Sequence, residues 1–271
     1  MDSEHQKIVI MICSMAGASI LGCIFNITSS LWLKLNNTPT KMVFLLSFYD
    51  IIANSSFIWS ALGHSNKTLC QWQSFLCVLG FMSSGILTCC FAHAFYVLNT
   101  SKDPDRLNYY FKIYVVASIV ISFAVGICAA FTDFMEPNEL GVCSFYASQG
   151  RTAINYPRAV ILSLPVFAFL SSLCWNFAVC QSVASSSGAK LILFIYPFIP
   201  GVCYFPLMIA NLTSKDESDY STPIKIISYM ALNAQGLLNA IFFGILSKII
   251  VICCARKTSP QEVPLRTMSI N

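Results

Sequence analysis

One acidic side chain interrupts an otherwise uncharged apolar stretch of the sequence, and it is the first candidate for chemistry. Asp50 lies within the apolar run from about residue 42 to 62. An ionisable residue inside a membrane span is costly to insert and usually marks a functional site. Amide side chains lie at a matching depth, because Asn26 and Asn239 stand about 12 to 14 Å along a helix from the nearest lysine, at about 1.5 Å per residue.

Further polar side chains adjoin these three residues. Asn54 and Gln235 lie about one helical turn closer to the outer face of the membrane. His93 lies near the cytoplasmic end of another apolar stretch. In a closed ring of seven helices the first, second and seventh are neighbours, so the amides would surround the carboxylate. The cluster would be either a static packing network or a bistable lock whose rearrangement opens the cytoplasmic face. The expected switch residues are Asn26, Asp50, Asn54, His93, Gln235 and Asn239.

The composition indicates that a membrane surrounds these residues. The chain has 271 residues, of which 56% are hydrophobic and 10% charged, and its mean hydropathy is +0.68. Soluble domains carry about 25% charged residues. The sequence therefore argues against a soluble enzyme, a disordered chain and a nucleic-acid-binding protein.

The spacing of the charged residues predicts the number of spans. Crossing the hydrocarbon core takes roughly 20 mostly apolar residues. Six uncharged stretches are long enough, and Asp50 interrupts a seventh. Only helices and closed barrels satisfy the backbone in lipid, and runs such as IVISFAVGICAAF lack the alternation of barrel strands. We predict an all-α membrane protein, a seven-transmembrane helix bundle. The expected spans are about 8–33, 42–62, 71–98, 111–132, 158–182, 190–212 and 224–247.

The placement of basic residues predicts the orientation of the bundle. With the N-terminus outside, ten lysines and arginines face the cytoplasm and six face the exterior, in agreement with the positive-inside rule. The N-terminus is short and acidic, and we expect no cleavable signal peptide. Residues 1–257 then form one transmembrane domain with a short juxtamembrane helix at 248–257. Residues 258–271 form a cytoplasmic tail, and the protein is expected to be a multi-pass protein of the plasma membrane.

Several cysteines and one sequon predict covalent modification. Cys70 begins the third span and Cys143 lies in the loop after the fourth, so we expect a disulfide that pins this loop over the bundle. Two free thiols are the alternative. Asn66, in the outer sequon NKT, is the expected glycosylation site. Cys253 and Cys254 follow the last span, where they are either palmitoylated or apolar residues of an interfacial helix.

The sequence lacks the residues that several known activities of seven-helix proteins require. A retinal protein needs a lysine midway along the last span, and residues 226–247 contain none. A catalytic zinc usually takes three protein ligands, whereas His5, His64 and His93 lie at different depths. We find no nucleophile–base pair, so we expect no enzyme, no metal and no cofactor. The remaining interpretation is a receptor that transmits a change of shape across the membrane. The alternative is a small-solute carrier of seven-helix type.

Four short segments share features with one receptor family. The loop SKDPDRLNYYF places an acidic-Pro-acidic-Arg element before paired tyrosines, and the last span reads ALNAQGLLNAIFFG. The second span contains SFYD, and the cysteine of the second outer loop is followed by an arginine near the fifth span. Together these segments resemble the slime-mould cyclic-AMP receptors and their relatives in protists, fungi and plants, which are G-protein-coupled receptors. The sequence lacks the Asp/Glu-Arg-Tyr, Cys-Trp-x-Pro and Asn-Pro-x-x-Tyr motifs of the rhodopsin-like class.

This resemblance implies a receptor in the lipid bilayer that binds a small extracellular ligand and activates a heterotrimeric G protein on the cytoplasmic side. Near the outer loop, Arg158 and Lys225 would either bind an anionic ligand or extend to the lipid headgroups. The candidate ligand-binding residues are Trp72, Arg151, Tyr156, Arg158, Lys225 and Tyr229. Basic residues of the cytoplasmic segments would meet the G protein or anionic lipid, or simply reflect the topology. They are Lys34, Lys41, Lys102, Arg106, Lys190 and Lys248.

Overall fold

A computed structural model gives the structure of the chain. It describes residues 3–32, 38–61, 67–101, 104–131, 135–137, 143–145, 166–167, 170–171, 173–175, 177–178, 198–213 and 222–246. The regular structure within these ranges is helical except for one short antiparallel hairpin. The long elements therefore agree with the predicted all-α class.

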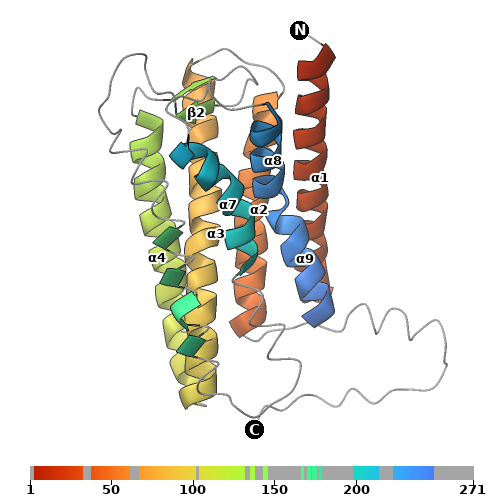
Figure 1. The fold of residues 1–271 in the computed structure, drawn as a ribbon. Helices are drawn as coiled ribbons and strands as arrows, with labels where there is room; N and C mark the ends of the chain where they lie inside the picture. The colour runs from red at the N-terminus through yellow and green to blue at the C-terminus, as the bar shows by residue number, and fades with distance from the viewer. Residues whose placement is uncertain are drawn as a thin grey trace, which may run out of the picture.

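The helices run along a shared axis (Figure 1). Helix α4 starts with a proline, which fits the first helical position because the N–H group there needs no intrahelical partner. The two strands pair with Glu136 opposite Ser144. The helices are α1 (Ser3–Trp32), α2 (Thr38–Ala61), α3 (Lys67–Ser101), α4 (Pro104–Phe131), α7 (Phe198–Thr213), α8 (Thr222–Asn233) and α9 (Gln235–Leu246), and the strands are β1 (Met135–Pro137) and β2 (Cys143–Phe145).

Five helical segments of the described chain are long and apolar enough to cross a membrane, so the protein is a multi-pass membrane protein. A shorter apolar segment, Phe198–Leu207, lies within the predicted sixth span, whereas the predicted fifth span, 158–182, falls mostly outside the described residues. The predicted juxtamembrane helix and tail also lie outside them. The five segments are Gln6–Trp32, Thr38–Trp59, Thr68–Ala94, Asp105–Cys128 and Ile226–Gly244.

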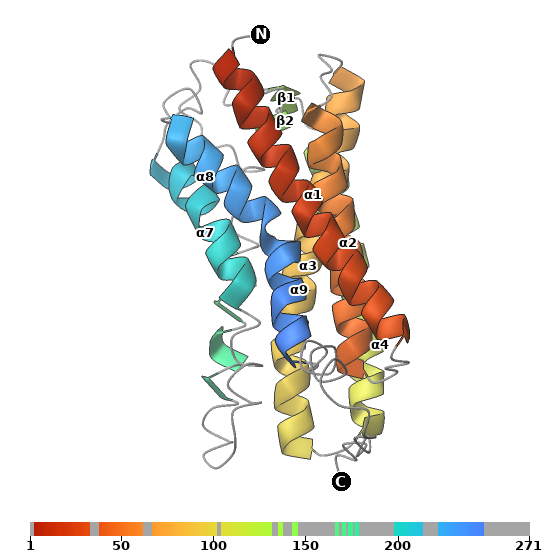
Figure 2. The same cartoon turned by 90° about the vertical axis from the view of Figure 1, so that its right-hand side faces the viewer.

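The helices pack as two groups around α1 and α3. Helix α3 lies between α2 and α4, and α1 packs against α2, α8 and α9 (Figures 1 and 2). We call the end of the bundle at which α1 begins the upper end, and the opposite end the lower end. The β1–β2 hairpin packs against α3 at the upper end. The expected contact among the first, second and last spans is confirmed, because α1, α2 and α9 all contact one another.

The structure divides the last predicted span, 224–247, into α8 and α9. The helix is interrupted at Ala234, and Figure 2 shows the change of direction there. The N–H of Ala234 donates to the carbonyl of Met230 over 2.9 Å, and the N–H of Leu238 donates to the carbonyl of Ala234 over 3.0 Å. The sequence predicts one uninterrupted helix, because the apolar run continues through the break and contains no proline.

Two glycines allow α9 to approach α1 closely. A Cβ atom on Gly236 would lie 2.4 Å from the Oγ of Ser19, and one on Gly22 would lie 3.0 Å from the Cβ of Ala240. Transmembrane helices associate largely through van der Waals contact, and small residues let their backbones come together. The segment just below the break is therefore fixed against α1.

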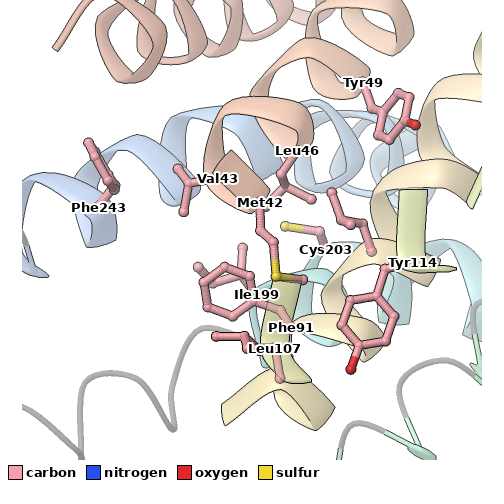
Figure 3. Close-up of a cluster of buried hydrophobic side chains, with 12 residues drawn as sticks. Met42, Val43, Leu46, Tyr49, Phe91, Leu107, Tyr114, Ile199, Cys203 and Phe243 are labelled. Carbon is pink, nitrogen blue, oxygen red and sulfur yellow. The ribbon is translucent and has the colours of Figure 1, made fainter. Parts of the chain in front are cut away.

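Buried apolar side chains form two clusters at different heights. The lower cluster, drawn in Figure 3, includes Met42, Leu46, Leu87, Phe91, Ile199 and Phe243. The upper cluster contains Ile12, Ala53, Phe57, Phe81, Tyr229 and Leu232. In the upper cluster the ring of Phe57 lies edge-on to Phe81 at 5.8 Å and to Tyr229 at 5.9 Å, and such pairs contribute about 0.5–1.5 kcal/mol each. Both clusters draw on α2, α3 and the last span, so a separate layer of the core lies between them.

Candidate functional site

Asp50 occupies the layer between the two apolar clusters. Its side chain is 0% exposed. On α2 it stands between Leu46 of the lower cluster and Ala53 of the upper cluster. The carboxylate therefore points into the bundle and away from lipid, at a depth where removal from water strongly disfavours a charge without partners.

Three side chains from two other helices donate hydrogen bonds to this carboxylate. The Oγ of Ser84 on α3 donates to Oδ1 over 2.8 Å, and the Nδ2 of Asn239 on α9 donates to Oδ2 over 2.7 Å. The Nε2 of Gln235 donates to Oδ1 over 3.2 Å and also bonds to the Oγ of Ser84. Hydrogen bonds to an ionised acceptor are about twice as strong as neutral ones. The carboxylate thus joins α2, α3 and α9 at one depth.

Helix geometry explains how these donors converge. Gln235 and Asn239 are four residues apart on α9, so they share one face of that helix. Ser84 reaches the carboxylate because α3 approaches α2 closely at Gly80, one turn away. A Cβ atom on Gly80 would lie 2.7 Å from the Cβ of Ala53. A short serine side chain spans the remaining gap between the two helices.

The amides around Asp50 use their NH2 groups and leave their carbonyl oxygens unpaired. Within the described residues, Oε1 of Gln235 and Oδ1 of Asn26, Asn54 and Asn239 accept no hydrogen bond from the protein. A buried polar atom without a partner costs about 1–3 kcal/mol. The layer therefore contains more hydrogen-bond acceptors than its described donors satisfy.

The structure brings four of the six expected switch residues together. Asp50, Gln235 and Asn239 bond through their side chains, and the Nδ2 of Asn54 donates to the backbone carbonyl of Asp50 over 2.7 Å. Asn26 is fully buried but donates to the Oγ of Ser47 over 3.1 Å, so it is not bonded to the carboxylate. Gln235 lies one turn above Asn239 on α9, as expected, and its longer side chain also reaches Oδ1 of Asp50.

His93 belongs to a different cluster. Its Nδ1 pairs with the hydroxyl of Tyr114, and its ring lies 4.6 Å from Trp175 and 5.3 Å from Tyr110. Tyr96 stacks on the same imidazole at 6.4 Å. These contacts join α3, α4 and the segment 173–175 below the Asp50 layer. In its described contacts His93 does not join the carboxylate.

The candidate ligand-binding residues are only partly described. Tyr229 is buried in the upper cluster, whereas Trp72 on α3 is 56% exposed, so these two residues do not share one surface. The backbone of Lys225 belongs to α8, and its side chain lies outside the described residues. Arg151, Tyr156 and Arg158 lie outside them altogether.

The predicted modification sites and basic contacts can be placed in part. Cys70 is buried and disulfide-bonded. The backbone of Cys143 begins β2, which packs against α3, while its side chain is not described. Lys41 and Arg106 are exposed at the lower end. The other predicted positions, Lys34, Asn66, Lys102, Lys190, Lys248, Cys253 and Cys254, fall outside the described side chains.

Comparison with known proteins does not assign the chain to a family. No protein-family model matches it, and no curated protein matches its sequence. Among the described residues, His, Cys, Asp and Glu side chains form no group of three that could hold a metal ion. The site is therefore characterised by the buried carboxylate and its neutral donors.

Proposed function

We propose that the chain is a plasma-membrane receptor that binds an extracellular ligand and activates a heterotrimeric G protein. The observation that carries this proposal is the bonding of one buried carboxylate to side chains of two other helices. The resemblance of the cytoplasmic loop and the last span to the cyclic-AMP receptor family supports it. In this proposal the upper end of the bundle faces outside and the lower end faces the cytoplasm.

The proposed switch is the exchange of partners within the Asp50 layer. In one state Ser84 and Asn239 hold the carboxylate, and in the other at least one of these bonds is released. The unpaired oxygens of Asn54 and Gln235 would accept the released donors, so the change costs a few hydrogen bonds of about 1 kcal/mol each. A ligand reverses a two-state equilibrium only through its difference in affinity for the two states, and a reversal from 1:99 to 99:1 takes about 5.5 kcal/mol.

The upper cluster would connect a ligand to this layer. Phe57 stands two turns above Asp50 on α2 and touches Tyr229 of α8 and Phe81 of α3 edge-on. Tyr204 of α7 extends this contact, because its ring lies 5.9 Å from Phe81. A ligand that moves α7 or α8 would therefore displace rings packed directly above the carboxylate. We propose that this displacement weakens the bonds to Asp50.

Guanine-nucleotide exchange in membranes that carry the full chain and a heterotrimeric G protein tests this proposal. We expect Asp50→Asn to change basal or ligand-driven exchange by about tenfold, since a hydrogen bond to a charged group contributes about 1.5–3 kcal/mol. Thr28→Val is the control, because Thr28 is exposed and bonds only to carbonyls of its own helix. Exchange is compared at equal surface expression. If Asp50→Asn lowers expression alone, the cluster is structural and the proposal loses its support.

One observation favours a small-solute carrier as a second candidate. The last span is interrupted at Ala234, level with polar side chains in the middle of the bundle. Transporters bind substrates and ions at such discontinuous helices near the bilayer midplane. Uptake by vesicles that contain the purified chain, without nucleotide exchange, would select the carrier. Exchange without uptake would select the receptor.

A further inference from the structure

Two lysines lie at the same height on neighbouring parallel helices at the lower end. The Oγ1 of Thr38 on α2 donates to the Oδ1 of Asn108 on α4 over 2.7 Å. Higher up, the hydroxyls of Tyr49 and Ser118 pair over 3.2 Å. The two contacts lie nearly the same number of residues apart on α2 as on α4. Residues that follow each contact by the same number of positions therefore lie at similar heights on the two helices. Lys41 and Lys112 each follow the lower contact by about one turn.

Neither lysine has a partner in the part of the chain that the structure describes. Both side chains are exposed, and neither forms a described ion pair or hydrogen bond. The nearest acid on α4, Asp105, lies two turns below Lys112 and has an interaction of its own. Arg106 lies over the ring of Tyr110 at 6.0 Å. Two like charges side by side at a membrane edge are stabilised most by an anion that contacts both.

An apolar strip rises from each lysine along its helix. On α2 the residues that follow Lys41 at helical spacing are Leu45, Phe48 and Ile52, and on α4 those that follow Lys112 are Val115 and Ile119. All five are partly or largely exposed to the membrane, and Phe48 is 49% exposed. Positions i, i+4, i+7 and i+11 share one face of a helix. Because the Thr38–Asn108 and Tyr49–Ser118 contacts join α2 to α4 in register, the two strips rise from the same level of the bundle.

We propose that this paired strip binds an anionic phospholipid, with its headgroup on Lys41 and Lys112 and its acyl chains along the apolar residues above. The proposal rests on the arrangement of α2 and α4 and goes beyond the proposed signalling function. Lysine stems extend along apolar surface while their amines reach the headgroup level. With the lower end in the cytoplasm, the strip faces the leaflet that holds the anionic lipids.

Lipid retention by the purified full chain tests this site. The chain is extracted from vesicles of equal parts phosphatidylserine and phosphatidylcholine, and the lipids that remain bound are counted by native mass spectrometry. We expect phosphatidylserine to be enriched by about fivefold for each lysine and about 25-fold for both. K41Q/K112Q should bring the ratio close to one, and K41R/K112R should preserve it. K7Q is the matched control, because Lys7 is exposed on α1 at the opposite end.

Four results would overturn the proposal. The first is no headgroup preference in the unmodified chain, and the second is an equal loss of preference in K7Q. The third is displacement of the bound lipid by millimolar inorganic phosphate, which would indicate a site for a free anion. If K41Q/K112Q instead weakens nucleotide exchange at an unchanged lipid ratio, the lysines bind a protein and the lipid site is wrong. Since lipid retention requires no G protein, its failure leaves the proposed function standing, and the reverse also holds.

Discussion

Asn239 and Asp50 are 189 residues apart in the sequence, and the Nδ2 of Asn239 donates a 2.7 Å hydrogen bond to the Oδ2 of Asp50. The other carboxylate oxygen is held by Ser84 and Gln235. Each oxygen therefore depends on a different set of donors. Single substitutions can remove the bond to Oδ2 or weaken those to Oδ1 without changing the charge of the layer.

Removing Asn239 should destabilise the bundle more while the carboxylate is present than after its replacement. We expect Asn239→Ala to cost about 1.5–3 kcal/mol, because it leaves one oxygen of a buried charge unpaired. In the Asp50→Asn background the same substitution should cost less, with a coupling of about 0.5–3 kcal/mol. Thermal unfolding of the four purified proteins of this double-mutant cycle measures the coupling. Additive effects would show that the bond contributes nothing specific.

Ser84 and Ser83 offer a matched pair on α3. Ser84→Ala removes a donor to Asp50 and a partner of Gln235, so we expect a severalfold change in basal nucleotide exchange. Ser83 has no bond to Asp50, because it bonds to the carbonyl of Ser118 over 3.3 Å and to the side chain of Tyr49, so Ser83→Ala should change exchange less. Equal effects of the two substitutions would argue that α3 packing, and not the carboxylate contact, sets the basal level.

The α1–α9 contact should tolerate no side chain at Gly236. A Cβ atom there would lie 2.4 Å from the Oγ of Ser19 and 2.6 Å from the Sγ of Cys23. Overpacking of this kind costs about 1–3 kcal/mol, so Gly236→Ala should lower the melting temperature by about 2–10 °C. Gly17→Ala is the control, since a Cβ on Gly17 meets no described atom within 4 Å. A melting temperature for Gly236→Ala that equals the control value would contradict the close contact.

The hydrogen bond between His93 and Tyr114 should stabilise the lower part of the bundle. Tyr114→Phe keeps the ring packing and removes the hydroxyl, so we expect a loss of about 1 kcal/mol. Tyr109→Phe is the control because Tyr109 is 64% exposed. Chemical unfolding followed by tryptophan fluorescence is a suitable measurement, since Trp175 lies against His93. If both variants unfold like the parent protein, the Tyr114 hydroxyl does not contribute to the stability of the fold.

The disulfide at Cys70 should distinguish this residue from the free cysteines. In the denatured protein without reductant, we expect maleimide to label Cys128 and to leave Cys70 unlabelled. Cys70→Ser should lower stability by about 2–4 kcal/mol, whereas Cys128→Ser should have little effect. Peptide mass spectrometry with and without reduction identifies the thiols. Labelling of Cys70 before reduction would rule out the disulfide.

The first four spans could be predicted from the sequence because each is a long apolar run bounded by charges. The predicted spans 8–33 and 42–62 correspond closely to α1 and α2. Helix α4 begins at Pro104, seven residues before its predicted span, because its first two turns are polar and lie outside the apolar window. Hydropathy therefore locates the membrane-crossing part of a helix but not its extension into the interface.

The position of Asp50 could also be predicted, whereas its donors could be predicted only in part. Depth counting places Gln235 one turn above Asn239, which agrees with α9, but it does not show that the longer glutamine side chain reaches the same carboxylate. It includes Asn26 in the cluster, whereas the amide of Asn26 bonds to Ser47 and not to the carboxylate. It missed Ser84, because its contact depends on the close approach of α3 to α2 at Gly80. Sequence spacing along one helix carries no information about such interhelical distances.

The enclosure of Asp50 between two apolar clusters has a kinetic consequence. Among the described residues, apolar side chains of the upper and lower clusters flank Asp50 along α2, so a proton that moves between this carboxyl group and water has to pass them. Proton exchange should therefore be slower here than at a carboxyl group exposed to water. The carboxyl group would then respond to a change of acidity outside the bundle only after a delay.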